Sequence, residues 1–447
     1  MRHKIKKLIR GDFPEQEINR LAFPAIIASI AEPLISLGDN MIIGTYSPPG
    51  ENYIGAVSLA SSLFLTIVWV FAQTRTAISA LIARFYGEKR LDEMRTLVPQ
   101  VIFMNFLLGL FFYLITTLFA SEIFSFYNAK GRLHEIAVEY YSIRALGLPL
   151  SLATYLIFGV FRGIQNTYWA MVIALVGGFV NLFLDLILMG GVEGWLNSQG
   201  IKGIAWASVA AQLIMLLLAI GVMYKKTIFR LNFLYEVNKQ IYTLLAFTGN
   251  LIIRSLSVQT AYFFSNRVAA GAGDMFMNVQ GVFFQIWLFA AFVVEGYCSA
   301  GNALAGKFYG EKNHEMLWRL GKFMSVRTLL IGLGLGILFL MIYPWVHLPF
   351  LTDAKEIELF QKVFWVVIIV LPLNAYAFVY DEMLKGMGRM AYLRDTLLMS
   401  TFLGFVPTVL LLEYMEWHLY AVWLAFVVWM IFRGTRLMLY FNRNFHY

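Results

Sequence analysis

The stretch "ALIARFYGEK" at residues 80–89 returns later in the chain as "ALAGKFYGEK" at residues 303–312, displaced by 223 positions. Two further matches occur at the same displacement: "LPL" at 148–150 and 371–373, and Arg162-Gly163, which returns as Lys385-Gly386. Three matches at one spacing indicate that the chain contains two copies of one structural unit.

Long uncharged apolar runs lie between the charged segments of both copies. Hydrophobic residues make up 60% and charged residues 14% of the 447 residues, whereas a soluble domain has about 25% charged residues. The runs approach the roughly 20 residues that cross a bilayer as a helix. We therefore expect an all-α membrane protein with twelve transmembrane helices, at residues 17–44, 53–83, 95–122, 135–160, 167–190, 200–224, 240–270, 275–306, 316–344, 356–384, 391–413 and 417–440.

Six expected spans separate the two copies, so both copies have the same orientation in the membrane. Parallel repeats of this kind occur in secondary transporters. We expect an N-terminal lobe at 1–224, a cytoplasmic linker at 225–240 and a C-terminal lobe at 241–447. With the N-terminus inside, the inner side carries 25 Lys and Arg residues and the outer side 4. This bias predicts a multi-pass protein of the inner or plasma membrane with both termini in the cytoplasm.

Several classes of function are disfavoured by the composition. The single cysteine, Cys298, excludes an intramolecular disulfide and a multi-thiolate metal site. The net charge of +8 comes from basic residues scattered among loops without a nucleic-acid-binding motif, so no nucleic acid partner is expected. The six histidines lie near expected loops or termini, and no nucleophile–base pair is evident. We therefore expect neither an intramembrane enzyme nor a cofactor.

Polar residues inside the expected spans of the first lobe are the strongest functional signal. A charged side chain at the bilayer centre costs about 2.5–3.5 kcal/mol, so it should face a cavity or a partner. Asn181 and Asp185 are four residues apart and share one helix face. Helical rise places Asp39, Asp185 and Ser208 roughly 8–12 Å below the outer ends of their spans.

These four side chains supply oxygen ligands at one depth. They can surround Na⁺ with hard ligands, or they can share a proton, because burial and like-charge repulsion favour a neutral acid. The sequence therefore predicts a coupling-ion site for H⁺ or Na⁺ at Asp39, Asn181, Asp185 and Ser208. The alternative is a static ion pair of Asp39 or Asp185 with Arg144, which lies within span 135–160.

The acidic cluster is not duplicated with the scaffold. At a displacement of 224 Asp39 corresponds to Phe263, and at 223 Asp185 corresponds to Thr408. A general requirement of the fold would be expected in both copies. The asymmetry therefore favours a functional role for the acids.

Five charged residues are candidates for the substrate cavity or for gating: Arg144 and the four that follow. Arg254 and Glu295 fall at comparable depths, so they form either a buried ion pair or a substrate contact. Asp381 lies near the inner end of its span beside Glu382 and Lys385, which favours a solvated helix end over a gating role. Glu32 is near mid-span, and it either pairs within the bundle or faces a cavity.

Several motifs together resemble the multidrug and toxic compound extrusion (MATE) family, and specifically its DinF-like branch. The resemblance extends over nearly the whole chain. The motifs are "LAFPAIIASIAEPLISLGDNMIIG" (21–44), "IGAVSLASSLF" (54–64), "ALIARFYGEKR" (80–90), "RGIQNT" (162–167), "IIRSLSVQTAYFFSNRVAAGAG" (252–273) and "FVVEGYCSAGNALAGKFYGEKN" (292–313).

The resemblance implies two six-helix bundles that form a V-shaped cleft and export organic cations and other amphiphiles in exchange for H⁺ or Na⁺. In the family pattern, the span 1 Asp matches Asp39, and the span 5 Asn and Asp match Asn181 and Asp185. The span 6 hydroxyl matches Ser208, where Thr is common in relatives. The span 7 Arg and span 8 acid match Arg254 and Glu295.

The resemblance leads us to expect a monomeric, cation-coupled antiporter that works in a lipid bilayer by alternating access. Its partners would be small organic cations and amphiphilic drugs or toxins. A lipid-linked oligosaccharide flippase of the wider superfamily is the alternative. Such a carrier needs a cationic cavity for a diphosphate, whereas the cavity expected here contains at least two acids against Arg144.

Overall fold

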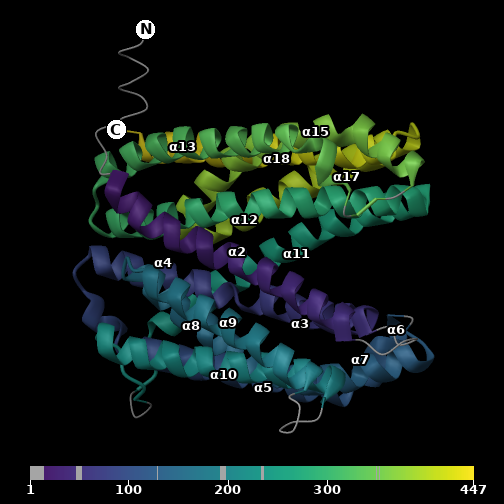
Figure 1. Cartoon of the computed structure of the whole chain (residues 1–447). Coiled ribbons are helices and arrows are strands. Elements are labelled where there is room, and N and C mark those ends of the chain that lie inside the picture. Colours follow the sequence, from purple (N-terminus) through teal and green to yellow (C-terminus); the bar gives the residue numbers. More distant parts are fainter. Residues whose placement is uncertain are drawn as a thin grey trace. The chain divides into compact units, whose positions relative to one another are not determined.

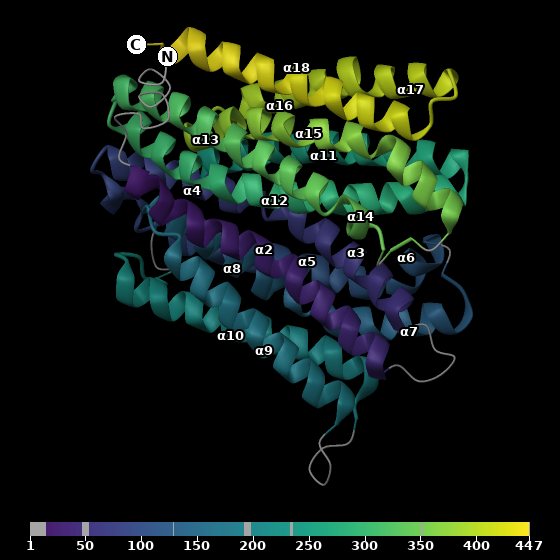
Figure 2. The same cartoon turned by 45° about the horizontal axis from the view of Figure 1, so that its top comes forward.

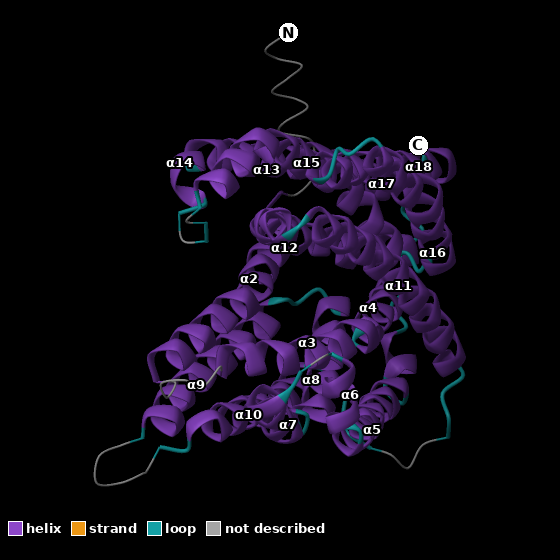
Figure 3. Cartoon of the chain, turned by 90° about the vertical axis from the view of Figure 1, so that its right-hand side faces the viewer, coloured by secondary structure: helices purple, strands orange, loops and turns teal. Residues whose placement is uncertain are grey.

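A computed structural model describes residues 15–46, 53–127, 129–191, 198–232, 236–348, 350–351 and 353–446. Within this part of the chain every regular element is helical, as Figure 3 shows. The side chains at 31–34 and 36–37 are outside the described set. The candidate Glu32 is one of them.

The helices follow one another along the chain as Figure 1 labels them. The first half contains α2 (Glu15–Tyr46), α3 (Tyr53–Phe71), α4 (Gln73–Gly87), η1 (Leu91–Met94), α5 (Leu97–Leu118), α6 (Ala120–Phe126), α7 (Gly131–Arg144), α8 (Gly147–Gly163), α9 (Tyr168–Gly190) and α10 (Gly200–Lys226). The second half, which Figure 2 shows from another side, contains α11 (Gln240–Ala272), α12 (Asp274–Gly310), α13 (His314–Met341), α14 (Tyr343–Val346), α15 (Ala354–Gly386), α16 (Met390–Met399), η2 (Ser400–Phe405), α17 (Val406–Tyr414) and α18 (Leu419–Phe445).

The expected all-α membrane fold is confirmed. Among the described residues, ten helices are long and apolar enough to cross a membrane, or up to eleven if a bent pair counts as one span. The bent pair is α7 and α8, which meet at 48° and correspond to the expected span 135–160. The first expected span corresponds to α2, whose 32 residues give a length of about 48 Å.

Several expected spans are interrupted, and two of the interruptions lie just before a proline. Pro149 has no N–H to donate to the carbonyl of Ala145, and the bend between α7 and α8 lies at Ala145 and Leu146. The span expected at 391–413 contains the π-helical segment η2, which ends at Phe405. The next helix, α17, begins at Val406 and has Pro407 in its first turn. Apolar periodicity alone does not reveal either break.

The chain forms two compact units, each with its own core. The first unit comprises Ile27–Ile82 and Arg90–Leu245, and its core includes Tyr141 and Phe124. The second unit comprises Met1–Ile26, Ala83–Lys89 and Ala246–Tyr447, and its core is rich in aromatic side chains such as Trp423. The boundaries place the end of α4 and the start of α2 in the second unit.

The repeated motif forms a reciprocal helix crossing within the second unit. A Cβ on Gly87 would strike the backbone of Lys307, and a Cβ on Gly310 would strike the backbone of Arg84. Gly310 lies 223 positions after Gly87, and Lys307 lies 223 positions after Arg84, so each contact is the counterpart of the other. The glycines of the two "FYGEK" motifs therefore allow the close approach of α4 and α12 around a local pseudo-two-fold axis.

Candidate functional site

The first unit holds the acidic side chains that the sequence places at one depth. Asp185 on α9 is fully buried and Asn181, one turn earlier, is 8% exposed. The Asn181 Nδ2 donates a hydrogen bond to Asp185 Oδ2 at 3.0 Å. The helical spacing of four residues therefore produces the contact expected from the sequence.

Asp39 on α2 meets Asp185 directly. The two carboxyl groups are hydrogen-bonded to one another. A carboxylate has no donor, so this contact requires a proton on one of the two acids. Asp39 Oδ1 and Asp185 Oδ1 are both buried, and neither has a hydrogen-bond partner among the described residues. The contact thus offers a position for one proton between the two acids and leaves two buried oxygen acceptors unused.

Glycines bring the two acidic helices together. A Cβ on Gly38 of α2 would strike Leu182 of α9, and a Cβ on Gly178 of α9 would strike Ile35 of α2. These two contacts lie on either side of Asn181, and each glycine lets a side chain of one helix pack directly onto the backbone of the other. The short aspartate side chains can therefore reach one another.

Ser208 lies level with the acids on the neighbouring helix α10. Gly203 of α10 faces Leu188 of α9, and Gly177 of α9 faces Met215 of α10. Residue numbers rise along α10 as they fall along the facing part of α9. Ser208, between Gly203 and Met215, therefore stands opposite residues 183–184. Ser208 is 5% exposed, and its hydroxyl forms no hydrogen bond within the described part of the chain.

Arg144 is close to the acids but is bonded elsewhere. Its Nη1 donates to Gln212 Oε1 at 3.1 Å, and its guanidinium lies 3.8 Å from the centre of the Phe64 ring. Among the described residues it forms no ion pair with Asp39 or Asp185, although it attracts both carboxyls through space. The alternative of a direct ion pair with Arg144 is therefore not what the structure contains.

Tyr140 is a member of the site that the sequence reasoning missed. It is 3% exposed on α7, its hydroxyl is hydrogen-bonded to Ser61, and it interacts electrostatically with Asp39, Asp185 and Arg144. The available signal was its position four residues before Arg144, which places both side chains on one helix face. Tyrosine is common among core side chains, so the signal was weak.

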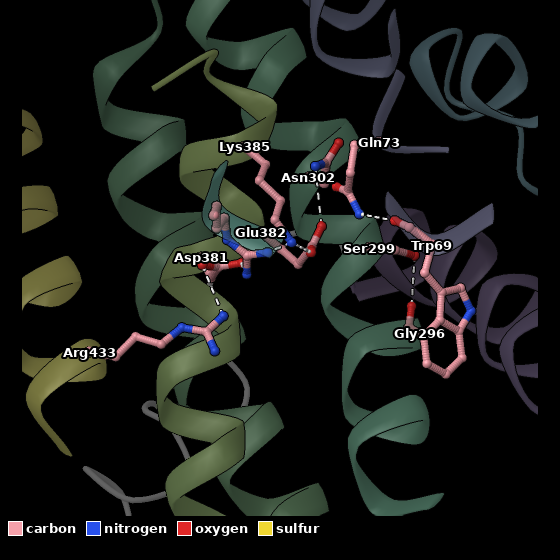
Figure 4. Close-up of polar contacts among 10 residues, drawn as sticks. Trp69, Gln73, Gly296, Ser299, Asn302, Asp381, Glu382, Lys385 and Arg433 are labelled. Atoms are coloured by element: carbon pink, nitrogen blue, oxygen red, sulfur yellow. Dashed lines mark hydrogen bonds and ion pairs between the residues drawn. The ribbon is translucent and has the colours of Figure 1, made fainter. Parts of the chain in front are cut away.

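The second unit contains a buried network of charged side chains. Arg254 Nη2 lies 2.7 Å from Asp381 Oδ2, Lys385 Nζ lies 2.8 Å from the same oxygen, and Arg433 Nη2 lies 3.0 Å from Asp381 Oδ1. Lys385 also lies 2.5 Å from Glu382 Oε1. Figure 4 shows the side chains of Lys385 and Arg433 extending toward the two neighbouring acids. We call these five residues the charged network.

One expectation for this unit is wrong, and one of the two alternatives for Arg254 and Glu295 does not hold. Asp381 is not at a solvated helix end but is 2% exposed, because α15 continues to Gly386 and packs this turn against neighbouring helices. Arg254 pairs with Asp381 and forms no ion pair with Glu295 within the described residues. The partner Arg433 comes from α18, 52 positions beyond Asp381, and helical spacing within one span cannot predict it.

Glu295 remains accessible beside this network. Its side chain is exposed on α12, and it is near enough to Arg254 to attract it through space. The charged network itself has three cations and two acids, so Glu295 supplies the third negative charge nearby. The Asp39–Asp185 pair and the Glu295 region therefore lie in different units.

The donor set of the acidic pair suits a small monovalent cation. Within the described part of the chain, no group of three or more His, Cys, Asp or Glu side chains could hold a metal ion. Asp39, Asn181 and Asp185 nevertheless supply carboxylate and carboxamide oxygens, two of which lack partners. Hard oxygen ligands of this type fit H⁺ or Na⁺ rather than a transition metal.

The comparison with protein families adds a second line of observation. The family model MatE matches residues 24–187 and again residues 251–415. The chain belongs to the MatE family. Its members are secondary transporters, so the chain is a multi-pass membrane transporter and not an enzyme. The two separate matches agree with the duplication seen in the sequence.

Relatives and solved structures match the chain over nearly its whole length. The DNA damage-inducible protein F of Escherichia coli (strain K12) is 24% identical over 431 residues, covering 95% of this chain and 91% of that protein. A probable multidrug resistance protein NorM of Thermotoga maritima is 22% identical, covering 99% and 96%. A crystal structure of MATE in the bent conformation superimposes with a TM-score of 0.87 at 21% identity, covering 98% and 97%. The chain therefore has the MATE fold, and a DinF protein is among its relatives.

Proposed function

We propose that this MATE transporter is an antiporter that exports organic cations and amphiphilic drugs or toxins in exchange for inward-moving H⁺ or Na⁺. The observation that carries the proposal is the hydrogen-bonded pair of Asp39 and Asp185. Asn181 and Ser208 complete the ion site, and no further cofactor is required. The protein works as a monomer in the inner or plasma membrane, with both termini in the cytoplasm.

The ion requirement follows from the electrostatics of the pair. Two ionised carboxylates in hydrogen-bond contact would repel strongly in a medium of low dielectric constant. A single H⁺ between them, or a Na⁺ bound by their free oxygens, removes this repulsion. Arg144 compensates only in part, because it is already bonded to Gln212 and stacked on Phe64. The pair is therefore most stable when it holds one small cation.

Ion binding changes the contact between two helices, and this supplies the link to transport. The carboxyl contact joins α2 to α9 at the level where Gly38 and Gly178 let the backbones approach. Loss of the cation would push the acids apart, and the tight glycine packing on either side would transmit the change along α2. In the proposed cycle, occupancy of the pair weakens substrate binding in the neighbouring cavity and release follows on the outer side.

The substrate class is inferred from the relatives and from Glu295. The relative in Thermotoga maritima is named as a probable multidrug resistance protein. An accessible acid such as Glu295 attracts organic cations, and aromatic or methionine side chains adapt to flat, apolar ligands. We therefore assign amphiphilic cations rather than anions to the transported class.

The test is efflux from proteoliposomes under two separate gradients. Efflux of a cationic dye is driven either by a Na⁺ gradient at fixed pH or by a pH gradient without Na⁺. We expect Asp39→Asn and Asp185→Asn each to abolish efflux under the active gradient while insertion remains normal. The matched control Asp92→Asn removes an exposed acid, 77% accessible, that pairs with Arg95 on the surface, and it should transport normally.

Two outcomes would overturn the proposal. Normal gradient-driven efflux in both aspartate variants would refute the ion site. Translocation of a lipid-linked oligosaccharide by the parent protein, without any dye efflux, would establish the flippase alternative instead.

A further inference from the structure

A small cavity lies in the second unit, and its lining residues belong to neither the acidic pair nor the charged network. Its volume is about 270 Å³. It is lined by residues of α2, α12 and α13, namely Glu15, Asn19, Tyr297, Arg327, Leu330 and Ile331. Drug-sized ligands occupy pockets of roughly 300–1,000 Å³. The cavity therefore suits a smaller group than a transported drug.

The polar atoms that line the cavity have unused hydrogen-bonding capacity. Arg327 Nη2 pairs with Glu15 Oε1 at 2.5 Å, but the Arg327 Nε is buried without a partner among the described residues. The Asn19 carboxamide and the Tyr297 hydroxyl also form no hydrogen bond within the described part of the chain. Buried polar groups normally find partners. The buried Arg327 Nε, together with the unpaired Asn19 and Tyr297 groups that line the same cavity, therefore favours a polar ligand.

The sequence around Arg327 places the cavity at the membrane boundary. Glu315, Arg319 and Lys322 precede Arg327 on α13, and the following residues 328–346 carry no charge. The helix α13 ends at Met341, so only residues 328–341, about 21 Å, continue it beyond Arg327. Glu15, which pairs with Arg327, is the first residue of α2 and precedes the first expected span at 17–44, so the ion pair lies at the inner end of that span. Leu330, almost one turn beyond Arg327, is 46% exposed and forms an apolar side of the cavity. The cavity thus lies at headgroup depth with an apolar rim.

We propose that this cavity binds the headgroup of a zwitterionic phospholipid such as phosphatidylethanolamine. Arg327 Nε, the Asn19 amide and the Tyr297 hydroxyl donate hydrogen bonds to the phosphate oxygens. Glu15, whose side chain is 45% exposed, keeps acceptor capacity for the headgroup ammonium. The acyl chains extend over Leu330.

The preference for a headgroup without net charge follows from the ion pair. Glu15 and Arg327 neutralise one another, so the cavity carries both signs of charge side by side. A zwitterion places its phosphate and ammonium against opposite members of this pair. An anionic headgroup satisfies Arg327 but faces the Glu15 carboxylate. Basic pockets at helix boundaries are known to bind lipid headgroups, and the acid here changes the selectivity.

The test is binding of short-chain lipids to the purified full-length protein in detergent. The probes are dihexanoyl phosphatidylethanolamine, dihexanoyl phosphatidylglycerol, phosphoethanolamine and inorganic phosphate. Asn19→Leu fills the cavity and leaves the ion pair in place, and Arg327→Met removes the phosphate donor. Arg319→Met is the matched control, because Arg319 forms an exposed ion pair with Glu315 on the same helix.

We expect saturable binding of the phosphatidylethanolamine that weakens roughly ten-fold or more in Asn19→Leu and Arg327→Met and is unchanged in Arg319→Met. If Arg327→Met fails to fold, Asn19→Leu alone decides the question. Equal binding by all variants, or no saturable binding, would overturn the site. Equal affinity for phosphatidylglycerol or inorganic phosphate would overturn the assignment to a zwitterionic lipid.

Discussion

Replacement of Asp381 by asparagine should be the most destabilising single change in the charged network. Asparagine has nearly the same size, so packing is preserved while one negative charge is lost. Arg254, Lys385 and Arg433 all lie within 3.0 Å of the Asp381 carboxylate. Without it, Glu382 would be the one acid left in the network, and it pairs with Lys385. Removing one partner of a buried ion pair costs about 3–5 kcal/mol, because the remaining charge is left uncompensated.

The assay is the apparent unfolding temperature of the purified protein, measured by the loss of its size-exclusion peak after heating. Asp381→Asn should lower this temperature by several degrees. Glu358→Gln is the matched control on the same helix, because it breaks an exposed pair with Lys362 at 2.7 Å and should leave the temperature unchanged. Equal unfolding temperatures for Asp381→Asn and the parent would refute the conclusion that the network is buried and mutually dependent.

Three further predictions concern helix contacts. Gly310→Ala should lower the unfolding temperature, since its Cβ would strike the Arg84 backbone, whereas Gly334→Ala on α13 meets open space and should not. Gly178→Val should cost about 1–3 kcal/mol by overpacking against Ile35, and efflux from proteoliposomes should fall with it. Asn238→Ala should increase hydrogen exchange at residues 236–240, because the Asn238 side chain bonds Glu93 O and Thr96 Oγ1; unchanged exchange would contradict this.

The sequence was sufficient for the fold and for much of the acidic site. The motif displaced by 223 residues predicted two copies, and the structure places the two motifs against one another through Gly87 and Gly310. Helical spacing also predicted the contact between Asn181 and Asp185. These features depend on local periodicity or on repetition, which a single sequence records directly.

The sequence was insufficient where a partner comes from a distant helix. Arg254 lies 127 positions from Asp381, and a depth estimate suggested an ion pair with Glu295 instead. Depth along a span does not specify which face of a helix is turned toward which neighbour. Tyr140 was missed for a similar reason, because its relation to Asp39 arises from the packing of α7 beside α2.

The most direct test of the account is infrared spectroscopy of the purified protein across a range of H⁺ and Na⁺ concentrations. The account predicts a carboxylic-acid C=O band from the Asp39–Asp185 pair that changes with the concentration of one of these ions. The same band should be absent from the double variant Asp39→Asn, Asp185→Asn. A parent spectrum that matches the double variant, or that responds to neither ion, would contradict the claim that this pair holds the coupling cation.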